Sequence, residues 1–242
     1  MTVHHELHDG VSQITLDRPE RRNALDHTTC AALTSAVAAA LDGGARAIVL
    51  AGTGRHFCAG ADLTGVEDRS FAGHLRQALD ALANAPVATI AAVQGAALGA
   101  GTQLAVACDL RVVASDARFG IPAAKLGLMV DHWTVQRVAL AAGFGPARAM
   151  LLAAEEIDAA AALSSGFAQR SGDLASALDW ATDIARLAPL TIAGHKLALN
   201  RLEQHLDDAD VRSAFDMAWA SEDLREGMTA FQEKRRPEFR GR

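Results

Sequence analysis

Two loops of small residues, each following an apolar run, hold the residue types that could do chemistry in this chain. The first loop covers residues 52–63 (GTGRHFCAGADL) and the second covers 95–101 (GAALGAG). We predict a buried strand before each loop, over 47–51 and 89–93, and a short helix over 102–107 after the second. A glycine turn that enters a helix exposes backbone N–H groups, which suit an anion or a developing oxyanion. The two loops could therefore form an oxyanion hole together, or their small residues could simply let helix and strand pack closely.

The elements that must position these loops alternate along the first half of the chain. We predict strands over 11–17, 47–51, 89–93 and 110–114, and helices over 28–41, 69–84 and 102–107, with Thr28 or Thr29 as the N-cap of the first helix. This order predicts parallel βαβ units with right-handed crossovers. We expect the histidines of the first ten residues, His4, His5 and His8, to lie in a frayed terminus.

After Asp131 the periodicity is helical almost to the end of the chain. The helical segments are 133–142, 146–154, 174–187, 190–205, 208–219 and 221–234. We therefore divide the chain into an α/β core, residues 1–188, and a C-terminal helical region, residues 189–242.

The composition excludes several classes of protein. The chain has 242 residues, a net charge of −6 and 50% apolar residues, as expected for a globular protein without a nucleic-acid surface. It has no apolar run long enough for a membrane span and no signal-peptide core, so we expect a cytoplasmic protein. The three cysteines lack CxxC spacing and no HExxH occurs, so we expect neither a disulfide framework nor a metal site.

Motifs along nearly the whole chain resemble the crotonase superfamily, which is the enoyl-CoA hydratase/isomerase family, and within it the hydratase-like mycobacterial members. The motifs are RP (18–19) with NAL (23–25), FCAGADL (57–63), GAALGAG (95–101) with CDL (108–110), FGIP (119–122), LG (126–127), QR (136–137), REGM (225–228) and FQEKR (231–235). The resemblance implies a spiral of ββα units followed by a helical region that forms trimers, which often pair into hexamers.

The resemblance also implies an acyl-CoA thioester as ligand, with no other cofactor. The thioester carbonyl would lie between the backbone N–H groups of Ala61 and Ala100. The nucleotide would lie along residues 20–24 and 59–63. In these two segments we assign Arg22, Ala24, Ala59, Asp62 and Leu63 to CoA binding. Phe231 and Lys234 match tail positions that often reach a neighbouring subunit's CoA, the alternative being a surface helix with one apolar anchor.

The chain departs from the family pattern at both catalytic carboxylates. Where family hydratases carry glutamates, this chain has Gln103 and Ala123. Glutamine can hold a water but exchanges no proton, and alanine can do neither. Since general acid–base catalysis contributes roughly 10²–10⁴-fold, we expect weak or absent hydratase activity.

One nearby carboxylate, Asp131, resembles the catalytic Asp of dienoyl-CoA isomerases and the nucleophilic Asp of chlorobenzoyl-CoA dehalogenases. Its partners in those enzymes are missing, because Ala123 replaces the isomerase Glu and Arg76 falls near the dehalogenase His. Asp131 could instead cap the helix that begins near Trp133. Three functions stay open: an acyl-CoA-binding protein of fatty-acid metabolism without hydratase activity, an Asp131-dependent isomerase, and a non-catalytic carrier or scaffold.

Overall fold

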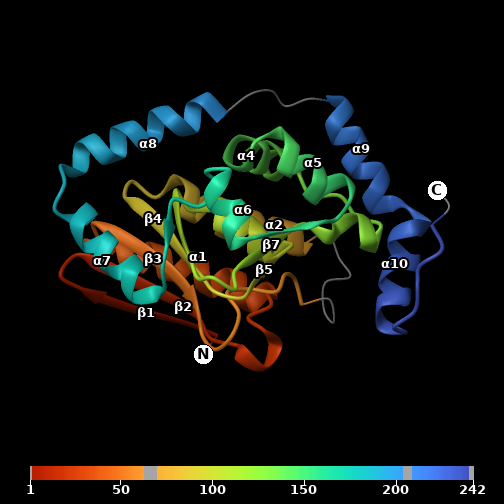
Figure 1. Ribbon diagram of the computed structural model, residues 1–242, viewed down its shortest axis with the longest axis horizontal. Coiled ribbons are helices and arrows are strands. Elements are labelled where there is room, and N and C mark those ends of the chain that lie inside the picture. The colour runs from red at the N-terminus through yellow and green to blue at the C-terminus, as the bar shows by residue number, and fades with distance from the viewer. Residues whose placement is uncertain (1, 63–69, 204–208, 240–242) are drawn as a thin grey trace.

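In the part of the chain that the structure describes, the larger of two β-sheets has six strands in the order β1-β2-β3-β4-β6-β9, of which Figure 1 labels β1 to β4. The structure is a computed structural model that describes residues 2–62, 70–203 and 209–239. The strands are β1 (Val3–His8), β2 (Val11–Leu16), β3 (Ala47–Gly52), β4 (Ala88–Val93), β6 (Leu110–Val113) and β9 (Arg170–Ser171). From β2 to β9 each neighbouring pair is parallel, which confirms the predicted βαβ units, and β1 pairs antiparallel with β2.

Helices cover both faces of this sheet. Alternate residues of each strand point to opposite faces, so each face packs against its own helices. In β3, Ile48 and Leu50 pack into the core formed with α1 (His27–Asp42), α2 (Ser70–Asn84) and α3 (Ala100–Ala107). Ala47, Val49 and Ala51 face the other way, against α7 (Leu174–Ala185). The continuous apolar run at 47–51 is thus a strand buried on both faces, as predicted.

A second sheet has three strands, in the order β5 (Ala96–Leu98), β7 (Arg118–Gly120) and β8 (Glu156–Asp158). β5 occupies the middle of the loop that we expected to be a plain turn. It is a strand because Ala97 pairs with Phe119 in β7, more than twenty residues away along the chain. The expectation that the chain is helical almost throughout after Asp131 is also wrong in part. The stretch that no predicted helix covers, residues 155–173, contains the strands β8 and β9 and the short helix α6 (Ala159–Ser164).

Two further expectations near the N-terminus are wrong. His4, His5 and His8 lie in β1, an edge strand ordered by its pairing with β2, and not in a frayed end. The N-cap of α1 is Asp26, whose carboxylate accepts hydrogen bonds from the backbone N–H of Thr29 at 2.7 Å and from its hydroxyl at 2.8 Å. An aspartate satisfies the exposed N–H groups of a first helical turn at least as well as a threonine does.

The remaining elements are helices and short 3-10 turns. They are α4 (His132–Ala142), α5 (Phe144–Leu152), α8 (Pro189–Glu203), α9 (Ala209–Ala220) and α10 (Glu222–Gln232), with 3-10 turns η1 (Pro19–Arg21) and η2 (Pro122–Leu126). Figure 1 shows α7 and α8 at one end and α9 and α10 at the other. α8 begins at Pro189, the residue at which we start the C-terminal helical region.

None of the helices within residues 2–62, 70–203 and 209–239 is long and apolar enough to cross a membrane.

Candidate functional site

The backbone at Ala61 is held by a short parallel bridge to Leu25. The N–H of Leu25 donates to the Gly60 carbonyl at 2.8 Å, and the N–H of Asp62 donates to the Leu25 carbonyl at 2.7 Å. In a parallel bridge these bonds involve the residues on either side of Ala61, so its own N–H points away from Leu25. Within the described part of the chain, no group accepts a hydrogen bond from the Ala61 N–H.

Ala100 offers a second backbone N–H at the start of α3. Gly99 is the N-cap of this helix, with φ of +53°, a conformation that favours glycine. The N–H of Gly99 donates to Gly120 at 2.8 Å, whereas the Ala100 N–H is one of the first-turn donors that a helix leaves unbonded. No acceptor for it is found among residues 2–62, 70–203 and 209–239.

The two loops that carry these N–H groups lie in direct contact. The N–H of Leu98 donates to the Cys58 carbonyl at 3.0 Å. A Cβ on Gly101 would lie 2.0 Å from the same carbonyl oxygen, so only glycine permits this approach. The small residues therefore allow close packing, which was one of the two interpretations, and this packing places two unbonded N–H groups on neighbouring segments.

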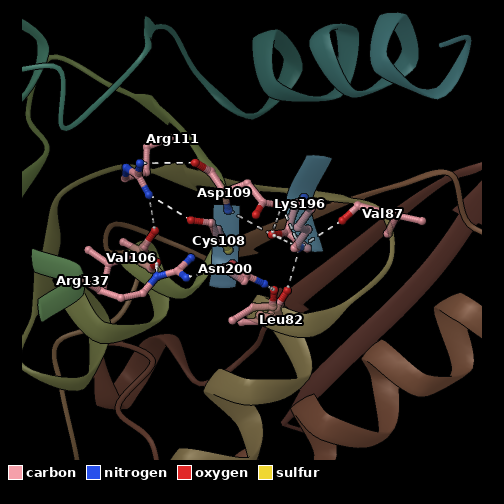
Figure 2. Close-up of polar contacts among 12 residues, drawn as sticks. Leu82, Val87, Val106, Cys108, Asp109, Arg111, Arg137, Lys196 and Asn200 are labelled. Atoms are coloured by element: carbon pink, nitrogen blue, oxygen red, sulfur yellow. Dashed lines mark hydrogen bonds and ion pairs between the residues drawn. The ribbon is translucent and has the colours of Figure 1, made fainter. Parts of the chain in front are cut away.

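The other end of α3 is fixed by two buried arginines (Figure 2). Arg111 donates to the carbonyls of Ala105 and Cys108, each at 3.0 Å, and Arg137 Nε donates to the Val106 carbonyl at 2.9 Å. These cations satisfy the C-terminal carbonyls of α3 and oppose the negative end of its dipole. The helix that presents the Ala100 N–H is thus held firmly at its far end.

Gln103 projects from α3 and is 8% exposed. Its amide oxygen accepts a hydrogen bond from the Thr134 hydroxyl at 3.1 Å. In the described residues nothing bonds its amide nitrogen. The two N–H donors of the Gln103 amide are therefore left for a water or a ligand.

Asp131 caps α4, one of the roles that the sequence left open. Its Oδ1 accepts the Thr134 backbone N–H at 3.0 Å, and its Oδ2 lies 3.4 Å from Arg76. Arg76 also pairs with Asp80 and stacks over Trp133, with the guanidinium carbon 4.1 Å from the ring centroid. Thr134 thus links the cap to Gln103, so Asp131 and Gln103 belong to one hydrogen-bonded group.

Ala123 lies half-buried in η2, three residues beyond Gly120, which is bonded to the first turn of α3 through Gly99 and Thr102. α10 supports η2 closely from outside, since a Cβ on Gly227 would lie 2.4 Å from the Leu126 carbonyl oxygen. The Trp219 indole N–H, from α9, also donates to the Met129 carbonyl at 2.9 Å. The C-terminal helices thus hold the segment that carries Ala123.

Four residues assigned to CoA binding meet where η1 approaches the 52–62 loop. The Ala59 N–H donates to the Arg22 carbonyl at 3.0 Å. The Ala24 carbonyl and the Asp62 carboxylate both accept hydrogen bonds from Arg18, at 2.7 and 3.0 Å. Leu63 lies outside the described residues.

Phe231 lies in the last turn of α10 and Lys234 lies two residues beyond its end, and both are exposed. Phe231 is 58% exposed, which is high for a phenylalanine side chain. An exposed aromatic and an exposed cation are available to a neighbouring molecule.

His56 and the cysteines contribute to the packing of this region. His56 Nδ1 accepts the Ala96 N–H at 3.2 Å, and burial together with Arg22, Arg55 and Arg118 lowers the pKa of this histidine. Burial also raises the pKa of the Cys30, Cys58 and Cys108 thiols to about 12, so all three stay protonated. Cys58 and Cys108 are buried and pack as small apolar side chains.

Arg18 is the residue of this region to which we assigned no role from the sequence. Its guanidinium lies 3.0 Å from Asp26 and 3.0 Å from Asp62. The Arg-Pro pair at 18–19 marks a turn, but no local pattern shows which carboxylates an arginine will meet in space.

An α/β core in which two adjoining strand-exit loops each present an unbonded N–H is the arrangement of a crotonase-fold protein. The sequence pattern of the enoyl-CoA hydratase/isomerase family matches residues 6–242. The probable enoyl-CoA hydratase echA6 of Mycobacterium tuberculosis is 47% identical over 246 residues, which cover 96% of this chain and 97% of the relative. The 2,3-dehydroadipyl-CoA hydratase of Escherichia coli is 36% identical over 243 residues, which cover 95% and 94%.

Solved structures agree with these relatives. A methylmalonyl-CoA decarboxylase aligns with a TM-score of 0.92 at 26% identity and covers 100% of this chain and 99% of its own. An enoyl-CoA hydratase/isomerase from Pseudoalteromonas atlantica aligns with a TM-score of 0.87 at 28% identity, covering 99% and 100%. The chain belongs to the enoyl-CoA hydratase/isomerase family of the crotonase superfamily.

Proposed function

We propose that this protein binds acyl-CoA thioesters in fatty-acid metabolism and has weak or no hydratase activity. The observation that carries the proposal is the pair Gln103 and Ala123, which stand where family hydratases have glutamates. The relatives named above act, by name, on CoA thioesters, which supports the ligand class. The unbonded N–H groups of Ala61 and Ala100 support binding of the thioester carbonyl.

The two N–H groups would polarise the thioester carbonyl without transferring a proton. Hydration needs in addition a base to activate water and an acid to protonate the α-carbon. The Gln103 amide can hold a water through its free nitrogen but cannot accept a proton at physiological pH. The Ala123 methyl group has no polar atom, so the protein would bind and polarise its ligand with little turnover.

The CoA moiety would lie along the junction of η1 and the 52–62 loop, where Arg22, Ala24, Ala59 and Asp62 meet. Leu63 completes this set by resemblance. Phe231 and Lys234 would extend the CoA site of a neighbouring subunit in a homotrimer or a hexamer. Four exposed leucines on α8 provide apolar surface that such an assembly would cover; they are Leu190, Leu197, Leu199 and Leu202.

A cytoplasmic location suits three cysteines that are buried and free of disulfides. A reducing compartment keeps such thiols reduced, and their raised pKa makes them poor nucleophiles.

The second candidate is a double-bond isomerase in which Asp131 is the sole proton shuttle. Its support is the hydrogen-bonded link from Asp131 through Thr134 to Gln103. The capping bond and the contact with Arg76 engage both oxygens of the Asp131 carboxylate, so the binder is the better supported function. A carrier that delivers acyl chains to a partner protein is a third form of the same binding function.

Calorimetry with matched ligands tests the carbonyl site without altering the protein. A saturated acyl-CoA thioester is compared with the thioether in which a methylene replaces the carbonyl. Two hydrogen bonds worth about 1 kcal/mol each predict that the thioester binds about 30-fold more tightly. Equal affinity for the two ligands would contradict the proposed role of the Ala61 and Ala100 N–H groups.

A further inference from the structure

Arg18 connects the start of α1 to the loop that carries Ala61. Its Nη1 lies 3.0 Å from the Asp26 carboxylate and donates to the Ala24 carbonyl at 2.7 Å, while its Nη2 lies 3.0 Å from the Asp62 carboxylate. The side chain of Arg18 is 15% exposed and that of Asp62 is 12% exposed. A guanidinium can span two carboxylates in this way because its donors are held in a rigid plane.

The two carboxylates have different anchors. Asp26 is fixed at the start of α1, because its other oxygen caps the helix through the Thr29 N–H. Asp62 directly follows Ala61 and donates its own N–H to the Leu25 carbonyl. The chain of contacts therefore runs from the first turn of α1 through Asp26, Arg18 and Asp62 to the peptide unit beside the Ala61 N–H.

Without the arginine, two negative charges would face each other at a partly buried position. Like charges in such a place repel, so the two side chains would move apart. Asp62 directly follows Ala61, so its displacement would disturb the bridge to Leu25, which holds the Gly60 carbonyl of the peptide unit that carries the Ala61 N–H. Alignment of a hydrogen-bond donor matters because the interaction weakens steeply away from linearity.

We propose that Arg18 is a positioning residue that orients the Ala61 N–H toward the carbonyl of a bound thioester. This inference rests on the proposed acyl-CoA function. Arg18 itself is not expected to touch the reacting group, and its effect should appear only in the part of the affinity that comes from the carbonyl.

The test compares thioester and thioether affinities in Arg18→Met and in a matched control, Arg46→Met. Arg46 is also half-buried and donates to a backbone carbonyl, that of Leu187 at 2.8 Å. The wild type and Arg46→Met should both prefer the thioester about 30-fold, whereas in Arg18→Met the preference should fall at least about fivefold, as expected when one of two hydrogen bonds is lost. Thermal unfolding shows whether each variant folds. If Arg18→Met does not fold, Arg18→Lys takes its place. Lysine cannot span both carboxylates, so Arg18→Lys should prefer the thioester by a factor between those of the wild type and a variant without the contact.

The ratio of the two affinities separates positioning from general damage. A change that merely loosens the protein weakens thioester and thioether binding alike and leaves the ratio unchanged. An unchanged ratio in both Arg18 variants would overturn the inference while leaving the proposed function intact. A wild type with no preference for the thioester would overturn the proposed carbonyl site itself.

Discussion

The Thr134 hydroxyl donates a hydrogen bond to the Gln103 amide oxygen across 3.1 Å, at the position that the family resemblance assigns to a hydratase glutamate. A carboxylate oxygen at position 103 could accept the same bond. Because Thr134 also donates its backbone N–H to Asp131, its own position is fixed by the start of α4. The surroundings of Gln103 therefore suit a carboxylate, as expected if the substitution that we propose removed the proton carrier and left its hydrogen-bond partner in place.

Restoring both carboxylates should restore hydration. The double variant Gln103→Glu, Ala123→Glu is expected to hydrate crotonyl-CoA at least about 10²-fold faster than the wild type, because each acid or base contributes roughly that much or more. The loss of absorbance of the conjugated thioester measures the rate. Each single variant is the matched control and should recover less; a double variant that binds the ligand but hydrates it no faster would refute the assignment of these two positions.

Substitutions at Asp131 separate capping from catalysis. Asp131→Ala should destabilise the protein by about 1 kcal/mol because the first turn of α4 loses its cap, whereas Asp131→Ser should change stability little. Urea unfolding measures both effects. If Asp131 acts only as a cap, acyl-CoA affinity stays unchanged in the serine variant and no isomerisation is seen in the wild type. Isomerase activity that disappears in Asp131→Ser would favour the second candidate function.

Lys196 should contribute strongly to the free energy of unfolding, because its contacts join α8 to the core (Figure 2). Its ammonium lies 2.8 Å from the Asp109 carboxylate and donates to the carbonyls of Leu82 and Val87 at 3.1 and 3.0 Å. Lys196→Met leaves the partly buried Asp109 without this cation, so we expect a loss of about 3 kcal/mol and a fall in Tm of about 6–12 °C. Lys125→Met, at an exposed lysine, should change Tm very little. Equal Tm values for the two variants would show that the pair does not stabilise α8.

His56 should make stability depend on pH. Its pKa is lowered below the ordinary 6.5, first by burial and then by nearby arginines, and its neutral Nδ1 accepts the Ala96 N–H. The unfolded chain therefore binds more protons than the folded chain just below pH 6.5. The stabilisation that neutral His56 provides is complete above about pH 6.5 and is lost as the pH falls toward the lowered pKa of the folded state. The amide oxygen in His56→Gln can accept the same N–H without titrating. Between about pH 7.5 and 5.5 the wild-type Tm should fall more steeply than that of the variant; parallel curves would argue against this account.

The parallel strands could be predicted because their signals are local. Residues 47–51 and 89–93 are continuous apolar runs, and each forms a strand buried on both faces. β1 and β5 could not be predicted in the same way. In β1, at a sheet edge, exposed residues alternate with half-buried ones. In β5 the residues are mostly small, and their strand geometry comes from pairing with β7.

The candidate site shows the same division between local and distant signals. The glycine turn before α3 marks where a helix offers unbonded N–H groups, and resemblance to a family marks Ala61, Gln103, Ala123 and Asp131. The Arg18 contacts could not be predicted, because Asp62 lies 44 residues away in the sequence and meets Arg18 only after the loops pack. The roles assigned to the site residues remain predictions that the experiments above test.

The most direct test of the central claim is a hydration assay on a sample whose acyl-CoA binding has been measured by calorimetry. The same enoyl-CoA is used for both, so binding and turnover refer to one ligand and one preparation. We predict saturable binding with little or no loss of the conjugated double bond. Rapid hydration by the wild type would contradict the account, because it would mean that Asp131 or another group supplies the proton transfer that Gln103 and Ala123 lack.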